Sequence, residues 1–345
     1  MRVGRTALVA GGVVVALVLG AAAAGLLWYR GQTNPSGPPG EPVAVSVPQG
    51  TSVAAIASLL EDAGVIGSAS AFRLYLRTKG GGSGFKAGDY ELPRRSSFDD
   101  VVAALEEGPE REFVRLTVPE GLTLPQVAER VGALPGRSAE AFLAAAGSGQ
   151  VRSRYQPAGS TSLEGLLFPD TYNVDEDEDE AEILRRMVST FDAKAAAAGV
   201  DKVVQGGLVD PYQAVVVASL VEREARVPED RGMISRVIYN RLKAGMPLQV
   251  DATVIYALGR TGERGLRVLF EDLEVDSPYN TYKVTGLPPG PIASPGLAAL
   301  EAAVSPTPGP WLYYVVVDAE GRHAFGTTAA EHSRNIAAAE RAGVR

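Results

Sequence analysis

The chain has 345 residues, 41 acidic and 33 basic side chains, a formal net charge of -8, two histidines and no cysteine. Without cysteine, disulfides and thiol chemistry are excluded, so burial of apolar side chains must stabilise the fold. The negative net charge disfavours nonspecific binding of nucleic acid and other polyanions. The histidines, His323 and His332, form no His-Glu-x-x-His or related pattern, and we expect no metal or other cofactor.

The first predicted element is an apolar helix near the N-terminus. Residues 6–29 carry no charge and consist mainly of Ala, Val, Leu and Gly, which is long enough to cross roughly 30 Å of hydrocarbon. Two arginines precede this segment and one follows it. The charge pattern favours a cytoplasmic N-terminus over residues 1–6, a single transmembrane anchor over residues 7–29, and a body outside the cytoplasm at the cell membrane.

A cleaved signal peptide is the alternative, because the small residues 21–24 could form a cleavage site. The apolar run is longer than the usual core of a signal peptide. It also ends in Leu26-Leu27-Trp28-Tyr29-Arg30, a sequence typical of an anchor at the membrane interface. The sequence therefore favours the anchor.

Residues 30–42 are rich in Gly, Pro, Ser and Gln, which predicts a flexible linker. An internal repeat follows, because residues 45–57 align with residues 116–128. Each copy predicts a short strand, a Pro-Gly turn and an amphipathic helix. The chain after the linker is therefore expected to have an α+β fold and to contain more than one domain.

The first copy resembles a small LysM-like α/β subdomain, which we place at residues 43–110. A helix at 72–76, a strand at 87–92 and a helix at 98–105 would complete it. Such a subdomain would bind glycan. The alternative is a scaffold on which the larger α+β domain, residues 111–345, docks.

The middle and the end of the chain give weaker patterns. Six acids at residues 175–180 favour a solvated loop, and they lack the alternating spacing and central glycine of a calcium loop. Near the C-terminus, residues 311–318 and 323–325 predict a β-hairpin. A helix over residues 329–341 is expected to follow it.

The most informative element is an apolar helix, residues 214–221, that runs directly into Glu222 and Glu224. Burial disfavours the charged form of a carboxyl group, so its pKa rises toward the range in which it can deliver a proton near neutral pH. A general acid that breaks a glycosidic bond needs this property. The alternative is that both are solvated acids at a helix end.

The two acids are not equivalent, since residues two apart on a helix project roughly 200° from one another. Glu222 has Arg226 four positions later, which favours an ion pair along the helix and a structural use. Glu224 has Pro228 at the same offset and therefore no charged partner along the helix. Glu224 is the better candidate for a raised pKa.

A second helix is predicted after the acids, from Pro228 to Leu242, with Gly245 as its cap. The two helices should pack as a hairpin with the acids at their junction. A short helix over residues 252–258 comes next, and Asp251 is its natural N-cap. Contact of Asp251 with substrate is the alternative. Pro- and Gly-rich residues 285–295 predict a rigid loop farther on.

Several ordered motifs carry a resemblance to a known family. They are Ala218-Ser219-Leu220-Val221-Glu222-Arg223-Glu224, Asn240-Arg241-Leu242, Gly245-Met246-Pro247-Leu248-Gln249, Asp251-Ala252-Thr253-Val254-Ile255-Tyr256, Tyr279-Asn280-Thr281-Tyr282 and Gly286-Leu287-Pro288-Pro289-Gly290-Pro291-Ile292. With these motifs the chain closely resembles the membrane-anchored endolytic murein transglycosylases, the MltG or YceG-like family, over essentially its whole length. The family pattern usually has proline where this chain has Ala252.

The resemblance implies non-hydrolytic cleavage of the β-1,4 bond between N-acetylmuramic acid and N-acetylglucosamine in peptidoglycan, leaving a 1,6-anhydro end. It assigns catalysis to the second glutamate of the pair, Glu224, first as general acid and then as general base. It further implies termination of nascent glycan strands and partnership with peptidoglycan polymerases, the penicillin-binding proteins.

The candidate substrate-binding side chains are Glu222, Asn240, Gln249, Asp251, Thr253, Tyr256, Tyr279, Asn280 and Tyr282. Amides, hydroxyls and tyrosine rings suit a sugar polymer, whose faces stack and whose hydroxyls need donors and acceptors. Glu164 and Asp170 lie in a further segment that resembles the family and are secondary candidates.

Two other functions fit the sequence. A hydrolytic muramidase would need a second carboxylate, for which Asp251 is the candidate. A noncatalytic glycan-binding scaffold of the wall-synthesis machinery would keep the loops but not depend on Glu224.

Overall fold

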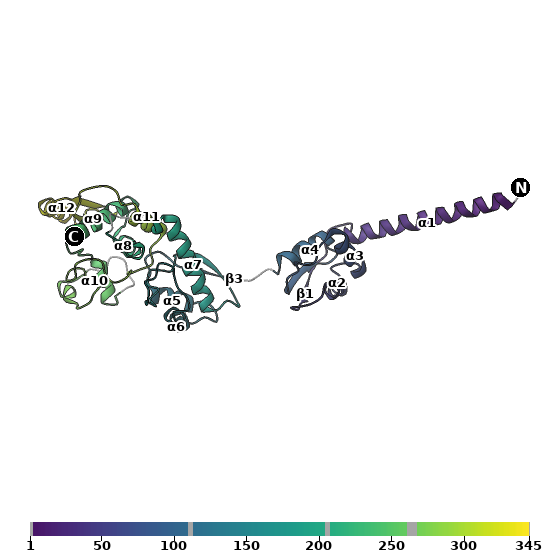
Figure 1. The fold of residues 1–345 in the computed structure, drawn as a ribbon, viewed down its shortest axis with the longest axis horizontal. Coiled ribbons are helices and arrows are strands. Elements are labelled where there is room, and N and C mark those ends of the chain that lie inside the picture. The colour runs from purple at the N-terminus through teal and green to yellow at the C-terminus, as the bar shows by residue number, and fades with distance from the viewer. Residues whose placement is uncertain (1–2, 110–112, 204–207, 261–267, 345) are drawn as a thin grey trace. The chain divides into compact units, whose positions relative to one another are not determined.

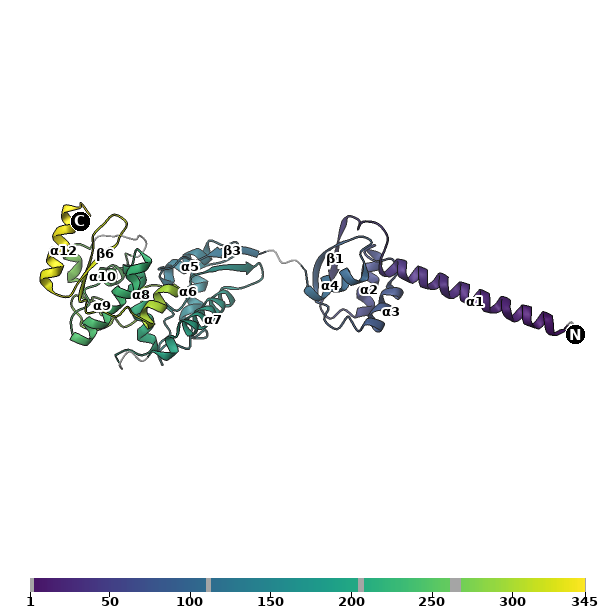
Figure 2. The same cartoon turned by 90° about the horizontal axis from the view of Figure 1, so that it is seen from above.

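The computed structural model describes residues 3–109, 113–203, 208–260 and 268–344, with side chains described from residue 15 onward. The chain forms two compact units, Met1–Glu112 and Phe113–Arg345. Helices and small two-stranded antiparallel sheets build both units, so the predicted α+β class is confirmed (Figures 1 and 2).

The first unit contains one small sheet covered by helices. Its elements are α1 (Val3–Thr33), β1 (Pro42–Val47), α2 (Val53–Asp62), α3 (Ala69–Lys79), β2 (Gly88–Pro93) and α4 (Phe98–Glu107). β1 pairs with β2 so that Val45 lies opposite Tyr90. The helices close over an apolar core in which the rings of Phe72 and Phe98 meet edge to face at 5.1 Å. The helices and strands predicted for residues 43–110 are present, while glycan binding by this unit stays a prediction.

The predicted transmembrane anchor is not confirmed. Helix α1 covers residues 7–29, but the side chains of residues 7–14 lie outside the description. Across the described residues, no helix reaches both the length and the apolar content of a membrane span.

The predicted linker begins later than expected and is held at several points. Helix α1 continues to Thr33, because Gly31 is tolerated within a helix and the first proline comes only at residue 35. The backbone of Gly40 donates a hydrogen bond of 2.7 Å to the carbonyl of Arg94, and the Arg95 side chain donates to the carbonyl of Ser36 at 2.6 Å. Residues 34–40 are therefore packed onto the first unit.

The second unit combines two small sheets with a set of helices. Its elements are β3 (Phe113–Thr117), α5 (Leu124–Gly132), α6 (Ala139–Gly147), β4 (Thr171–Asp175), α7 (Glu180–Ala198), η1 (Val200–Lys202), α8 (Pro211–Glu224), η2 (Pro228–Asp230), α9 (Arg231–Ala244), α10 (Asp251–Ala257), η3 (Phe270–Glu274), α11 (Leu297–Val304), β5 (Tyr313–Val316), β6 (His323–Gly326) and α12 (Ala329–Arg341). β3 pairs with β4, and β5 pairs with β6.

The internal repeat is present as two similar local structures. β1 leads into α2, and β3 leads into α5, through turns whose glycines have nearly equal backbone angles, φ +80° at Gly50 and φ +79° at Gly121. Glycine adopts this left-handed conformation without the penalty that a Cβ imposes. The predicted acidic loop at 175–180 is shorter than expected, because Asp179 caps α7 and Glu180 is its first residue.

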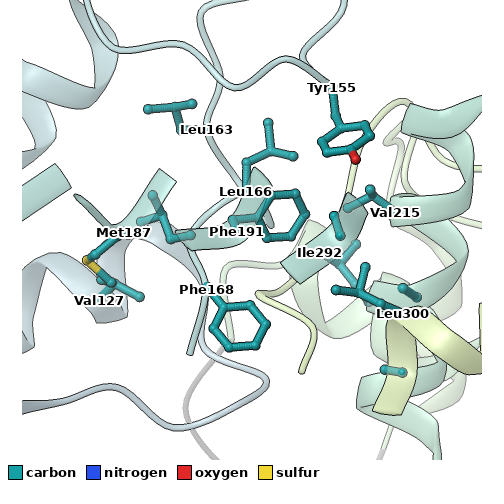
Figure 3. Close-up of a cluster of buried hydrophobic side chains, with 14 of the residues drawn as sticks. Val127, Tyr155, Leu163, Leu166, Phe168, Met187, Phe191, Val215, Ile292 and Leu300 are labelled. Carbon is teal, nitrogen blue, oxygen red and sulfur yellow. The ribbon is translucent and has the colours of Figure 1, made fainter. Parts of the chain in front are cut away.

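The core of the second unit surrounds α8. Side chains from α5, α7, α8, α11 and the loops at 155–168 and 292 meet in one apolar cluster (Figure 3). Residues 214–222 of α8 are buried without interruption, so every side of this part of the helix lies inside the unit. The core therefore fixes the position of the acids at the C-terminal end of α8.

Candidate active site

Helix α8 ends at the acid that the sequence singles out. Asp210 and Gln213 form a capping box at its start, and Pro211 occupies the first turn. Glu224 is its last residue, and Ala225 is already extended with φ -69° and ψ 125°. The chain then turns through η2 into α9, which packs against α8, so the predicted helical hairpin with acids at its junction is confirmed.

Glu224 opens into a cavity of about 380 Å³. The walls come from the ends of α8 and α10, from α9, from the loops around residues 249 and 282, from β5 and β6, and from the C-terminal helix. The lining residues are Glu224, Arg226, Arg241, Leu248, Gln249, Asp251, Tyr282, Tyr314, Val315, Val316, His323, His332 and Val344.

The carboxyl group of Glu224 has a raised pKa. Its side chain is partly buried, and the hydroxyl of Tyr314 donates a hydrogen bond to its Oε2 at 3.0 Å. Loss of water and, secondarily, the negative charge of Asp251 raise the pKa of Glu224 to about 7, although the bonds from Tyr314 and the Ala252 backbone act in the opposite direction. Near neutral pH this group can both give and take a proton.

Asp251 is the second carboxylate at the cavity. The hydroxyl of Tyr282 donates a hydrogen bond to its Oδ1. The prediction that Asp251 caps a helix is wrong, because Val250 occupies the N-cap position and Asp251 lies inside the first turn of α10. Its carboxylate is therefore available to the cavity and to Tyr282.

Arg241 lines the cavity and connects three of the segments around it. Its Nε donates to the carbonyl of Leu312 at 2.6 Å, and its Nη1 donates to the carbonyl of Leu248 at 2.7 Å. One planar side chain therefore ties α9 to the loop before α10 and to the start of β5. Beside it, Gln249 has a left-handed backbone, φ +51°, and its N–H donates to Thr281 O at 3.1 Å.

Comparison with known proteins identifies the family. The model of the YceG-like family matches residues 45–338. This chain belongs to the YceG-like family. An endolytic murein transglycosylase of Bacillus subtilis is 36% identical over 306 residues, which cover 85% of this chain and 83% of that protein.

Two further relatives support the same family. An endolytic murein transglycosylase of Streptococcus pneumoniae is 34% identical over 86% of this chain, which spans 58% of the length of that relative. The crystal structure of a putative yceG-like protein from Listeria monocytogenes is 34% identical, with a TM-score of 0.56 over 86% of this chain and 99% of that one.

Four of the predicted site residues of this YceG-like chain lie together. They are Glu224, Gln249, Asp251 and Tyr282, and all four line the cavity. Since three different segments carry them, only the fold brings them to one place.

Three predicted residues have structural contacts instead. Asn240 donates to the carbonyls of Gly309 and Trp311 at 3.0 and 2.8 Å. Asn280 is fully buried and donates to the carbonyls at residues 273 and 275. Thr253 is also buried, and its hydroxyl donates to the carbonyl at residue 250. These side chains hold the loops that form the cavity wall.

Glu222 lies on the other side of α8 from the cavity lining. It is 3% exposed and accepts a hydrogen bond from the N–H of Gly296 at 3.2 Å. Glu222 and Arg226 do not share one helix as expected, because α8 ends at Glu224 and Arg226 lies beyond it, at the cavity. The two acids do face different surroundings, as their spacing predicts.

A second polar cluster contains three of the remaining candidates, Tyr256, Tyr279 and Glu164. The rings of Tyr256 and Tyr279 lie 4.8 Å apart, and the Tyr256 hydroxyl is 3.4 Å from Glu164 Oε2. Glu164 accepts the N–H of Leu124 at 3.0 Å, and burial raises its pKa to about 7. Asp170 is exposed and accepts the N–H of Thr171 at 2.7 Å, away from both clusters.

Sequence reasoning missed the cavity wall formed by β5 and β6. Tyr314 and His323 come from the predicted hairpin, but nothing in the local pattern connects that hairpin to an acid 90 positions earlier. His323 belongs to the second strand of that predicted hairpin. It is indeed on β6, and it also lines the cavity.

Proposed function

We propose that this YceG-like protein is an endolytic peptidoglycan lytic transglycosylase in which Glu224 alone transfers the proton. The observation that carries the proposal is a carboxyl group with a pKa of about 7 at the wall of a polar cavity. The relatives named endolytic murein transglycosylase support the choice of substrate.

The reaction begins with Glu224 in its protonated form. The carboxyl proton goes to the glycosidic oxygen between N-acetylmuramic acid and N-acetylglucosamine as the bond from that oxygen to C1 breaks. The C6 hydroxyl of the muramyl sugar then attacks C1, and the Glu224 carboxylate takes the hydroxyl proton. The acid is regenerated, the product is a 1,6-anhydro sugar, and no water is consumed.

Other cavity residues assist this chemistry. A positive charge develops on the sugar ring in an oxocarbenium-like transition state, and a nearby carboxylate stabilises it. Asp251 supplies this carboxylate, and the Tyr282 hydroxyl holds the Asp251 side chain in place. Gln249 offers an amide for sugar hydroxyls at the same wall.

The test is the pair of variants Glu224→Gln and Glu222→Gln, each incubated with purified glycan strands that are not cross-linked. Glutamine keeps the shape of glutamate but cannot deliver the proton, so Glu224→Gln should reduce cleavage by at least about 10³-fold. Glu222→Gln serves as the matched control, because Glu222 faces Gly296 and not the cavity. Full activity of Glu224→Gln, or equal losses in both variants, contradicts the proposal.

A two-carboxylate muramidase is the second candidate. It is favoured by one observation, that Asp251 lies at the same cavity and influences the pKa of Glu224. In that reaction Asp251 would activate a water or attack C1. The products differ, since hydrolysis leaves a reducing end and lytic cleavage leaves an anhydro end.

We further propose that the enzyme acts outside the cytoplasm at the cell membrane and terminates nascent strands beside peptidoglycan polymerases. This rests on the uncharged segment at residues 6–29 and on the family resemblance. Fractionation of cells that produce the full chain tests the location. Recovery of the intact chain in the soluble fraction would contradict it.

A further inference from the structure

We propose that Tyr314 is the positioning residue that orients the carboxyl group of Glu224, and that the Asp230–His323 pair in turn holds Tyr314. This inference rests on the proposed function, because it assigns a task within the proton transfer by Glu224. It concerns the β5–β6 hairpin, which the sequence did not connect with catalysis.

The first step is the contact between strand β5 and the end of α8. The Tyr314 hydroxyl donates to Glu224 Oε2 at 3.0 Å. Burial and the carboxylate of Glu224 raise the pKa of the Tyr314 phenol well above its ordinary value, so the hydroxyl keeps its proton. The Tyr314 hydroxyl occupies a lone pair of Oε2, which favours the neutral acid with its proton on Oε1, and the backbone N–H of Ala252 is a second donor to the same carboxyl group.

The second step is the support of Tyr314 from β6 and from the α8–α9 junction. The ring of His323 meets the ring of Tyr314 edge to face, at 5.4 Å and 80°. Asp230 Oδ2 lies 2.8 Å from both the backbone nitrogen and Nδ1 of His323. Both side chains are almost completely buried, at 6% and 3% exposed.

The charge state of His323 agrees with a fixed support. Burial lowers the pKa of His323 despite the neighbouring carboxylate of Asp230, so the ring is neutral at neutral pH. A carboxylate only accepts hydrogen bonds, which places the single ring proton on Nδ1, toward Asp230. The imidazole is therefore locked in one tautomer and one orientation against Tyr314.

This arrangement explains how a flexible glutamate can serve twice as a proton carrier. Two oxygens of a carboxyl group are equivalent until a donor distinguishes them. With Oε2 held by Tyr314, Oε1 carries the proton to the glycosidic oxygen and afterwards receives the one from the C6 hydroxyl. A misoriented carboxyl group would slow the proton transfer, because that step needs a heavy-atom distance of about 2.6–3.2 Å.

The test compares Tyr314→Phe with Tyr313→Phe in the full-length protein. Both variants remove one hydroxyl from β5, but Tyr313 stacks on His332 and lies outside the cavity lining among the described residues. Tyr314→Phe should lower kcat by about 10- to 100-fold with KM within about twofold, as expected for a group that acts on the transition state. Tyr313→Phe should leave kcat unchanged.

A pH profile separates positioning from general damage. The Tyr314 bond lowers the pKa of Glu224, so its removal should move the alkaline limb of kcat/KM to higher pH. The other titratable or charged groups around the cavity are Arg226, Arg241, Asp251, Tyr282, His323 and His332. They remain in both variants, so the limb of Tyr313→Phe should stay where it is.

A double-variant cycle tests the support by His323. His323→Phe keeps an aromatic ring against Tyr314 and the backbone bond to Asp230 but removes the bond from Nδ1, so kcat should fall less than in Tyr314→Phe. Adding His323→Phe to Tyr314→Phe should lower kcat little further, because His323 acts through Tyr314. If the losses of kcat in the two single variants add up in the double variant, His323 does not act through Tyr314. If His323→Phe does not fold, His323→Asn replaces it in the same cycle.

The outcomes distinguish this inference from the proposed function. If Glu224→Gln is inactive while Tyr314→Phe matches the unmodified protein in kcat and in pH profile, the positioning role is wrong and the function stands. If Glu224→Gln is fully active, the proposed function is wrong, and the role of Tyr314 falls with it.

Discussion

Glu224 depends on its neighbours for the pKa that the reaction needs. The prediction that Glu224 has a raised pKa follows from the sequence, because the apolar helix and the two-residue spacing can be read directly. Its actual partners, Tyr314 and Asp251, cannot be read in this way, since they come from β5 and from the start of α10. A helix end is a local property, whereas a cavity is made by segments far apart in the chain.

The variant Asp251→Asn tests the electrostatic part of this account. The negative charge of Asp251 raises the pKa of Glu224, so removing the charge should lower that pKa. Glu224 must be protonated to begin the reaction, and the alkaline limb of kcat/KM should therefore move below about pH 7. Measurement of kcat/KM between pH 5 and 9 checks this. An alkaline limb that stays in place or rises would contradict it.

Glu164 gives a prediction for stability. Its pKa is about 7 in the folded protein and 4.5 without the protein environment, so the folded state binds more protons between these values. The free energy of unfolding should then fall as pH rises from 4.5 to 7 and stay level above, by up to about 3 kcal/mol for this group.

The variant Glu164→Gln removes this titration. Urea denaturation at pH 5 and pH 8 should show a smaller difference in unfolding free energy than in the unmodified protein. Glu224 still titrates in the variant, so some pH dependence should remain. An unchanged difference between the two pH values would show that Glu164 is not the buried acid described above.

At the scale of elements, local sequence predicts the helices and the hairpin, whereas the contacts of the polar loop residues depend on packing. The predicted helices, the repeat and the C-terminal hairpin followed by a helix are present, because local periodicity and caps specify them. The predicted substrate residues Asn240, Thr253 and Asn280 illustrate the limit. Their amides and hydroxyls suit a sugar, but they suit the carbonyls of a neighbouring loop equally well, and in the structure all three donate to such carbonyls.

Gly165 tests how closely two of these loops pack. It has φ +74°, and a Cβ there would lie 2.2 Å from Pro291 Cβ and 3.0 Å from Ala293 O. Gly165→Ala should therefore destabilise the protein by at least about 2 kcal/mol more than Gly159→Ala does. Gly159 is the matched control, since it has φ +81° with nothing within 4 Å of its Cβ position. Melting temperatures that fall equally in both variants would contradict close packing.

At the scale of the whole molecule, the two units have separate apolar cores. Every residue that lines the cavity at Glu224 belongs to the second unit. Residues 113–345 should therefore fold on their own and cleave soluble glycan strands with kcat within about threefold of the full chain, since the acid and its partners are all present. Circular dichroism and a cleavage assay check this. A truncated chain that folds but has lost activity would show that the first unit contributes to the chemistry.

The most direct measurement is mass spectrometry of glycan products formed in water labelled with oxygen-18. The account predicts strands that end in 1,6-anhydro-N-acetylmuramic acid, carry no label, and disappear with Glu224→Gln. Reducing ends that contain the label would show that water is the nucleophile. That result would contradict non-hydrolytic cleavage with Glu224 as the only proton carrier.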